Sequence, residues 1–418
     1  MKKIIILTVL LILLGSLGAA AETTITFSAG QDATGTTTEL IELFEKENPD
    51  INVEYISMPS VPNQQYDRYV TMFASQDSSI DVLASDIIWI SQFAAANWIE
   101  NISDDISTET KTKLLEGPLE ANTYKGDLYG LPWYTDAHFM YYRKDLLDKY
   151  GYNPPETWTE LINQTNNIIE KENNSELNGI TYQAAQIEGI TITYLEFLRG
   201  AGGRVLDDMG NFVLDNKYRD NGLEALQMMN DLIYKYNAAP KSVAAANPND
   251  SKIMFQNGKA IFMLNWPFAW AQLQGDNSIV KDKVGIAKIP HFEGHPDTNT
   301  SNLGGWQIVL NKFSENKDEA IRFMEFLIGY EAQKKFSIDG GHLPVVKEVY
   351  DDKDVLENSP YYKDLFDVFM NAFPRPTTEQ YPKLSSAMQS ELNATVSGVK
   401  DVEEAYNSML NKMSEILE

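Results

Sequence analysis

The strongest constraint on the fold is an alternation of strand and helix patterns that begins just after residue 22. Short strand-like segments are each followed by an amphipathic stretch with helical spacing. Strands and helices in strict alternation are joined by right-handed crossovers, so the sequence predicts an open α/β sheet. The predicted elements are strands at 24–27, 51–55 and 80–84, a helix that begins at Glu39 and ends at Asn48, and a helix over 66–75.

The same alternation returns after Pro132 and indicates a second α/β unit. A strand is predicted at 139–142 and a short helix at 145–150, and Thr157 with Glu160 has the spacing of a capping box. The chain has 418 residues, a length that favours two or three domains. We therefore expect two lobes with several chain crossings between them. Helices with a buried apolar stripe are predicted at 218–236, 318–335 and 401–417.

Residues 1–21 have the pattern of a secretory signal peptide. Lys2 and Lys3 precede an apolar run over 4–17, and small residues continue to Ala21. An uncleaved membrane anchor is the alternative, although the run is shorter than the roughly 20 residues that span a bilayer. The chain contains no cysteine, which excludes disulfides, thiolate metal ligands and a lipid attached at cysteine. We therefore expect an exported protein that is free in the periplasm.

The charge of the chain excludes two classes of partner. Lys and Arg number 34 against 60 Asp and Glu, a formal net charge of -26. Nucleic acid and anionic membrane surfaces attract basic faces, so neither is an expected partner. His291 and His295 are potential metal ligands, but turn-forming residues surround them and no predicted helix presents them on one face. Because the sequence also has no phosphate-binding loop and no nucleophile motif, we expect no metal and no cofactor.

Two carboxylates and two tryptophans lie next to predicted strands, where open α/β sheets bind their ligands. Asp86 follows the strand at 80–84, and Asp136 lies in a Pro-aromatic stretch between the two units. Trp266 ends one predicted strand and Trp306 precedes another. Simpler roles stay open for each, because an Asp at these places also caps helices or forms turns, and tryptophan is common in cores.

Together these residue types indicate a sugar site. An indole covers the apolar face of a pyranose ring, and carboxylates and guanidinium groups bind its hydroxyls. Arg375 is a long donor held between two prolines, although an exposed charge is the alternative. Gly304 and Gly305 allow close approach of the backbone to a ligand, or else form a tight turn.

Several segments resemble the family 1 extracellular solute-binding proteins of ABC sugar importers, most closely the trehalose/maltose-binding proteins. They occur in family order along nearly the whole mature chain, and their combination is specific although each is short. The segments are 81–98 (DVLASDIIWISQFAAANW), 130–145 (GLPWYTDAHFMYYRKD), 155–158, 254–270 (MFQNGKAIFMLNWPFAW), 284–294, 303–306 and 374–376.

The resemblance implies a set of sugar contacts and also shows one departure. In the most similar relatives an acidic residue of the first loop and an arginine near the position of Gln65 help to hold the sugar. Here the loop at 30–35 reads GQDATG, and Arg68, one helical turn from Gln65, is the candidate substitute. The implied contacts are Asp86, Tyr134, Asp136, Trp266, Gly305, Trp306 and Arg375.

The resemblance also implies the architecture, a two-lobed periplasmic-binding-protein fold of the class II type. Two open α/β sheets are joined by a hinge of several crossings, with crossings expected near 131–136, 286–290 and 329–337. The expected boundaries are 22–133 and 286–332 for the first lobe, and 134–285 and 333–418 for the second.

The sequence therefore predicts a monomeric periplasmic protein that binds an oligosaccharide without turnover. A trehalose- or maltose-like disaccharide would be captured between the lobes and delivered to an ABC permease. A secreted glycosidase is the alternative, with Asp86 and Asp136 as its carboxylate pair. The polar and aromatic surroundings of both residues favour binding of hydroxyls over a raised acid pKa.

Overall fold

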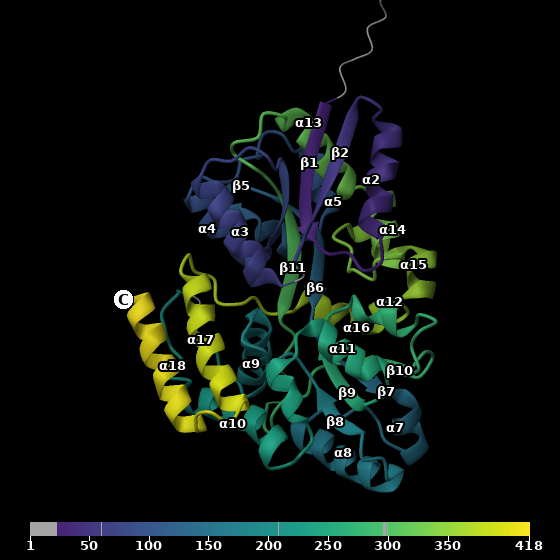
Figure 1. Ribbon diagram of the computed structural model, residues 1–418, viewed down its shortest axis with the longest axis vertical. Coiled ribbons are helices and arrows are strands. Elements are labelled where there is room, and N and C mark those ends of the chain that lie inside the picture. Colours follow the sequence, from purple (N-terminus) through teal and green to yellow (C-terminus); the bar gives the residue numbers. More distant parts are fainter. Residues whose placement is uncertain (1–22, 60, 208, 296–297, 299) are drawn as a thin grey trace, which may run out of the picture.

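The computed structural model describes residues 23–418 apart from 60, 208, 296–297 and 299. The predicted signal peptide, residues 1–21, lies outside this part of the chain. Two α/β lobes lie one above the other in Figure 1, each with its own sheet. A helix long and apolar enough to cross a membrane does not occur among the described residues.

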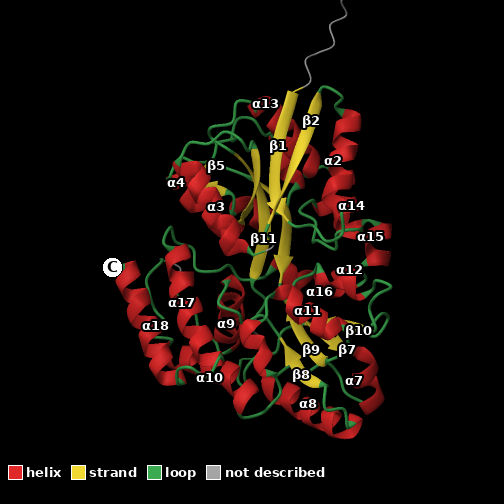
Figure 2. Ribbon diagram, in the orientation of Figure 1, coloured by secondary structure: helices red, strands yellow, loops and turns green. Residues whose placement is uncertain are grey.

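The first lobe is built on a five-stranded sheet covered by helices on both faces (Figure 2). The first three strands of the chain pair in parallel, as the alternating pattern predicts, and β11 runs antiparallel between β3 and β6. The strand order is β2 (Ile51–Met58), β1 (Thr23–Gly30), β3 (Val82–Asp86), β11 (Leu303–Leu310) and β6 (Leu131–Ala137).

Alternate residues of these strands enter two different cores. Phe27 and Ile308 face the helices α2 and α13 together with Phe44 and Phe323, whereas Val309 faces α3 and α4. This period of two is the reason why short apolar runs form buried strands here. Helices therefore cover both faces of the sheet, and the side chains that they leave uncovered lie at the ends of the strands.

The second lobe has a four-stranded sheet in the order β10 (Val284–Ala287), β7 (Phe139–Arg143), β9 (Ala260–Asn265) and β8 (Asn178–Thr181). Only β8 and β9 are parallel, and β7 and β10 run antiparallel to their neighbours. Its largest helical layer contains α9, α10, α17 and α18, which pack on one another. A small hairpin of β4 (Thr123–Tyr124) and β5 (Asp127–Leu128) completes the strands of the described chain.

The helices follow the predicted patterns with one exception. The helix predicted at 318–335 is two helices, α13 and α14, because the backbone of Gly329 is extended between them. Bounds are α2 (Thr36–Glu47), α3 (Pro62–Ala74), α4 (Ile90–Ala95), α5 (Thr108–Lys113), α6 (Glu116–Glu120), α7 (Lys144–Tyr150), α8 (Trp158–Glu172), α9 (Glu188–Gly200), α10 (Arg219–Tyr234), α11 (Pro248–Gln256), α12 (Ala269–Leu273), α13 (Lys317–Leu327), α14 (Tyr330–Ile338), α15 (Lys353–Asn358), α16 (Tyr361–Met370), α17 (Tyr381–Val396) and α18 (Val402–Leu417). Short 3-10 turns are η1 (Ile87–Trp89), η2 (Lys241–Ala245) and η3 (Lys347–Asp351).

The predicted capping box at the start of α8 is half formed. The Thr157 hydroxyl accepts a hydrogen bond from the backbone N–H of Glu160 at 3.2 Å. The Glu160 carboxylate accepts from the N–H of Glu156 instead of Thr157, at 2.8 Å. The two hydrogen bonds therefore tie Glu156 to the first turn of α8, whereas the capping-box motif involves Thr157 and Glu160 alone.

Three connecting segments run side by side between the lobes. The chain leaves the first sheet after Ala137 and returns between Ala287 and Leu303. The His138 N–H donates to the carbonyl of Asn302 at 3.4 Å, and the Leu303 N–H donates to that of Phe373 at 2.7 Å. We call these three hydrogen-bonded segments, after Ala137, before Leu303 and near Phe373, the hinge.

Two of the expected boundaries lie inside secondary structure elements. The boundary between 133 and 134 lies within β6, and that between 332 and 333 lies within α14. The hinge crossing expected at 329–337 is wrong, because these residues begin and form α14, which packs on α2 and α13 of the first lobe. The segment near Phe373 takes the place of this crossing.

Candidate functional site

The ends of three neighbouring strands bring the predicted residues of the first lobe into one row. Trp306 of β11 pairs with Asp86 of β3 on one side and with Tyr134 of β6 on the other. Gly304 pairs with Asp136, two positions along the same strands. The pairing register therefore places a carboxylate, an indole, a phenol and a second carboxylate at one edge of the sheet.

Trp266 of the second lobe reaches this row at a glycine. A Cβ on Gly304 would lie 2.6 Å from the Trp266 ring and 3.1 Å from the Cβ of Asp136, so only glycine fits. Gly305 has a φ of 131°, which side-chain-bearing residues rarely adopt, and a Cβ there would lie 2.7 Å from the Tyr134 carbonyl. The two glycines thus allow β11 to pass between the candidate ligand residues of both lobes.

Asp136 is the most unusual side chain of this row. It is 8% exposed, and its Oδ1 atom is buried without a hydrogen-bond partner in the structure. Burial raises the pKa of Asp136 well above its usual range, and the charge of Asp86 adds to this effect while Arg375 opposes it. A buried acceptor without a donor costs stability, so a hydrogen bond donated to this atom would stabilise the fold.

Arg375 connects the two lobes. Its Nη2 donates to Oδ1 of Asp86 at 2.7 Å, and its Nη1 donates to Oε1 of Glu188 at 3.1 Å. Burial opposes the charged guanidinium, but Asp86, Tyr381 and Glu188 together raise the pKa of Arg375 above its usual value. The Nε of Arg375 is buried without a partner, so one donor of this group stays available.

Glu188 is a site residue that the sequence analysis missed. It begins α9, is 6% exposed, and accepts hydrogen bonds from the hydroxyls of Tyr381 and Ser385 as well as from Arg375. Burial raises the pKa of Glu188, and Arg375 opposes this shift. An acidic residue in the first turn of a helix was its only sequence signal, and such residues are commonly exposed.

Asp86 combines both of the roles that its position allowed. Its Oδ1 accepts from the backbone N–H of Ile88 at 3.3 Å, which makes it the N-cap of η1, and its carboxylate pairs with Arg375. The cap fixes the side chain at the end of β3 before any ligand is considered. Capping and participation in the site are therefore compatible.

Arg68 does not join these residues. It is exposed on α3 and lines a separate surface depression with Thr71 and Met72 among others. Gln65, in contrast, is buried beside Gly30 and donates to the Pro59 carbonyl at 2.7 Å. The departure from the family pattern at Gln65 is thus not compensated by Arg68 in this arrangement.

The acidic residue of the first loop has a structural role. Asp32 accepts backbone N–H bonds from Thr34 at 2.8 Å and from Thr37 at 2.7 Å, and it also accepts from Gly35. Both carboxylate oxygens are therefore engaged at the start of α2. Hydrogen bonds from Thr34 and Thr37 outweigh burial and lower the pKa of Asp32.

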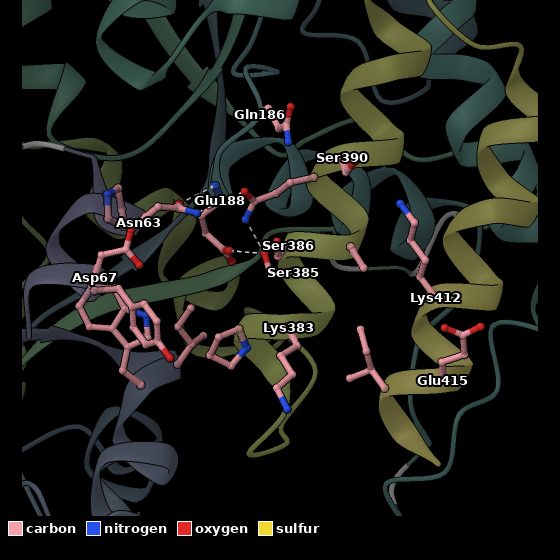
Figure 3. Close-up of a pocket in the computed structure, with 18 residues that line it drawn as sticks. Asn63, Asp67, Gln186, Glu188, Lys383, Ser385, Ser386, Ser390, Lys412 and Glu415 are labelled. Atoms are coloured by element: carbon pink, nitrogen blue, oxygen red, sulfur yellow. Dashed lines mark hydrogen bonds between the residues drawn. The ribbon is translucent and has the colours of Figure 1, made fainter. Parts of the chain in front are cut away.

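An open groove of about 900 Å³ adjoins the site between the lobes (Figure 3). Asn63 and Asp67 of α3 lie on one side, and Lys412 and Glu415 of α18 lie on the other. The groove reaches the strand ends through Glu188 and through Trp89, whose ring centroid lies 5.6 Å from that of Trp306. We place the site at the strand ends because Oδ1 of Asp136 and Nε of Arg375, two buried atoms without partners, belong to the residues gathered there.

Metal chemistry finds no support in this geometry. A group of three or more His, Cys, Asp or Glu side chains arranged to hold a metal does not occur in the described part of the chain. The acidic residues of the site face a guanidinium instead. Their arrangement is that of a binding site for a polar ligand with both donors and acceptors.

Two α/β lobes, a three-segment hinge and polar and aromatic residues from both lobes define a two-lobed binding protein. The sequence family is in agreement, because residues 29–334 match the model of the family described as bacterial extracellular solute-binding protein. The chain belongs to this family.

The relatives agree in sequence and in structure. A probable ABC transporter-binding protein of Deinococcus radiodurans is 32% identical, over 81% of this chain and 80% of the relative. The maltose-bound MalE3 structure of T. maritima is 36% identical with a TM-score of 0.89, covering 94% of this chain and 99% of that one. A solute-binding protein of Thermotoga lettingae bound to alpha-D-tagatose is 27% identical with a TM-score of 0.85, covering 95% and 100%.

Proposed function

We propose that this protein is the sugar-binding component of an ABC importer and that it encloses an oligosaccharide between its lobes. A maltose- or trehalose-like disaccharide is the proposed ligand. The observation that carries this proposal is Asp136, a buried carboxylate with an Oδ1 that has no hydrogen-bond donor. A sugar hydroxyl supplies such a donor, and the free Nε of Arg375 supplies a donor to a second hydroxyl.

The aromatic residues support a ring-shaped ligand. Trp306 and Trp266 are each partly buried and come from different lobes, next to the carboxylate of Asp136. An indole face covers the apolar C–H groups of a pyranose while its hydroxyls reach the rim. A ligand that touches both tryptophans contacts both lobes and favours their closure.

The ligands of similar proteins support the same class. The MalE3 structure contains maltose, the Thermotoga lettingae structure contains a monosaccharide, and a relative in Pyrococcus abyssi with 25% identity is a maltotriose-binding protein. We further propose that the protein acts in the periplasm after removal of residues 1–21, as a monomer that presents both lobes to the permease.

A binding screen tests the proposal. Maltose, trehalose, sucrose and maltotriose are added to the purified chain, and affinity is measured by calorimetry beside a thermal shift. At a ligand concentration 100 times Kd the expected stabilisation is about 2.7 kcal/mol. If no member of a broad glycan set binds or raises the melting temperature, the sugar proposal is wrong.

A glycosidase remains the second candidate because burial raises the pKa of Asp136, as in a catalytic acid, against the expectation from its polar and aromatic neighbours. The geometry argues against it, since both oxygens of Asp86 accept hydrogen bonds from Arg375 and Oδ1 also accepts one from the Ile88 N–H. Overnight incubation with each bound disaccharide, followed by chromatography, separates the two functions. We expect intact disaccharide, and released monosaccharide would favour the enzyme.

A further inference from the structure

The site contains three carboxyl groups and one guanidinium group. One guanidinium, that of Arg375, lies between the carboxylates of Asp86 and Glu188, and Asp136 adds a third carboxylate close enough to respond to both Asp86 and Arg375. All four side chains are buried. A single buried cation is therefore shared by two acidic partners before any ligand arrives.

Glu188 is one of the two acidic partners of Arg375, and hydrogen bonds hold its side chain in place. Three donors point at its two oxygens, and two of them, the hydroxyls of Tyr381 and Ser385, carry no charge. The backbone N–H of Glu188 donates to the Asn63 side chain at 3.2 Å, which ties it to α3 of the other lobe. Figure 3 shows the side chain directed toward Ser385 of α17. Its position is thus set by four contacts, which come from the helices α3 and α17 and from the loop that carries Arg375.

We propose that Glu188 sets the charge selectivity of the cleft, so that the site accepts uncharged sugars and rejects acidic ones. This inference rests on the proposed sugar-binding function and extends it to the class of sugar. Glu188 is a positioning residue, because it acts on the ligand through Arg375.

The physical reason is that Glu188 and Asp86 together occupy the guanidinium group of Arg375. With both Nη atoms engaged by carboxylates, Arg375 offers a ligand its Nε–H and little net charge. A hydroxyl uses this donor and the free Oδ1 of Asp136. An anionic group in the same place meets uncompensated carboxylates in a poorly solvated site, where like charges repel strongly.

The experiment compares two ligands that differ in charge and little in shape. Maltitol and maltobionate share a glucosyl unit and an open chain, and they differ by a terminal CH₂OH or carboxylate. Calorimetry at pH 7.5 gives the ratio of their Kd values, and trehalose with trehalose 6-phosphate forms a second pair. For the natural chain we expect the neutral ligand to bind at least tenfold tighter.

Glu188→Gln keeps the size of the side chain and removes its charge. We expect the preference for the neutral ligand to fall by roughly tenfold in this variant. Glu391→Gln is the matched control, because Glu391 is an equally buried glutamate that pairs with Lys400 and Lys412 and has no contact with Arg375 in the structure. The control is expected to keep the ratio of the natural chain.

The results distinguish a failure of the proposed sugar-binding function from a failure of the role proposed for Glu188. If neither neutral ligand binds the natural chain, the proposed ligand class is wrong. If the neutral ligand binds and the acidic one binds equally well, or if Glu188→Gln leaves the ratio unchanged, the role of Glu188 is wrong. Should circular dichroism show that Glu188→Gln does not fold, Glu188→Met makes the same charge change without a buried amide, and the ratio of the natural chain is measured in any case.

Discussion

Asp136 destabilises the ligand-free fold and, in our proposal, accepts a hydrogen bond from the sugar. Its pKa is raised because burial and Asp86 disfavour the charged form. A carboxyl with a raised pKa binds protons more strongly in the folded than in the unfolded state. Its unfavourable contribution therefore grows as the pH rises above about 4, the usual pKa of an aspartate.

Asp136→Asn is expected to stabilise the ligand-free protein and to weaken sugar binding. Removal of the buried charge should raise the free energy of unfolding by roughly 1–3 kcal/mol at pH 7.5 and by less at pH 4.5. Loss of a charged acceptor should weaken affinity about tenfold or more. Urea unfolding at the two pH values and calorimetry measure both effects. A variant that is less stable at pH 7.5 and binds sugar normally would contradict this account.

Truncation of two tryptophans of this chain should change different properties, sugar affinity in one case and stability in the other. Trp306 is partly buried at the end of β11, whereas Trp158 is 1% exposed and stacks on Phe197 at 4.1 Å between ring centroids. We expect Trp306→Ala to lower sugar affinity at least tenfold, because the platform for the ring is lost. Trp158→Ala is expected to cost about 3–5 kcal/mol of stability. Unfolding curves and titrations of both variants test the contrast, and unchanged affinity in Trp306→Ala would remove this residue from the site.

At the scale of single elements, local patterns predicted most of the fold. Strands at 24–27, 51–55 and 139–142 are confirmed because apolar alternation and burial agree in them. The break between α13 and α14 was missed, since apolar residues with helical spacing occur on both sides of Gly329. Helical spacing describes which face is buried and does not show where the backbone changes direction.

The site was only partly predictable for a different reason. Strand ends and residue chemistry brought out Asp86, Asp136, Trp266 and Trp306, because each is adjacent to a recognisable strand. Glu188 meets Arg375 across 187 positions of sequence, and no local pattern reports such a contact. Arg68 was proposed because it lies one helical turn from Gln65, near which relatives carry a sugar-binding arginine, and in the structure it is exposed on α3.

The start of α2 gives a prediction for one element. Asp32 takes the part of a cap, and its pKa is lowered by the hydrogen bonds of Thr34 and Thr37 against the opposing effect of burial. Asp32→Ala should therefore cost about 1 kcal/mol of stability. The stabilising contribution is present above pH 4 and disappears as the pH falls through the lowered pKa of the folded state.

Denaturation of the Asp32→Ala variant at pH 7 and at pH 3 checks this expectation. Thr38→Ala, at an exposed position of the same helix start, is the control and should change stability little. Because both Asp32 oxygens are occupied within the loop, we expect sugar affinity to change by less than a few fold. A large loss of affinity without loss of stability would indicate that Asp32 contacts the ligand.

For the whole molecule, the hinge and the two-lobe site together predict a change of shape. Three adjacent segments join the lobes, and the candidate ligand residues come from both sides of them. A ligand that contacts both lobes shifts the population toward the closed form by its difference in affinity for the two forms. We expect the radius of gyration from X-ray scattering to decrease when a sugar known to bind is added. Scattering curves that superimpose with and without that sugar would contradict hinge closure.

The position of β11 has a consequence for the order in which the protein assembles. This strand lies between β3 and β6, yet it comes from residues 303–310, more than 160 positions after β6 ends at Ala137. A chain that emerges from its N-terminus therefore has β6 with no neighbour until the entire second sheet has been made. Contacts so distant in sequence form slowly. The first lobe therefore contains the first residues of the chain and yet stays incomplete until residues 303–310 have been made.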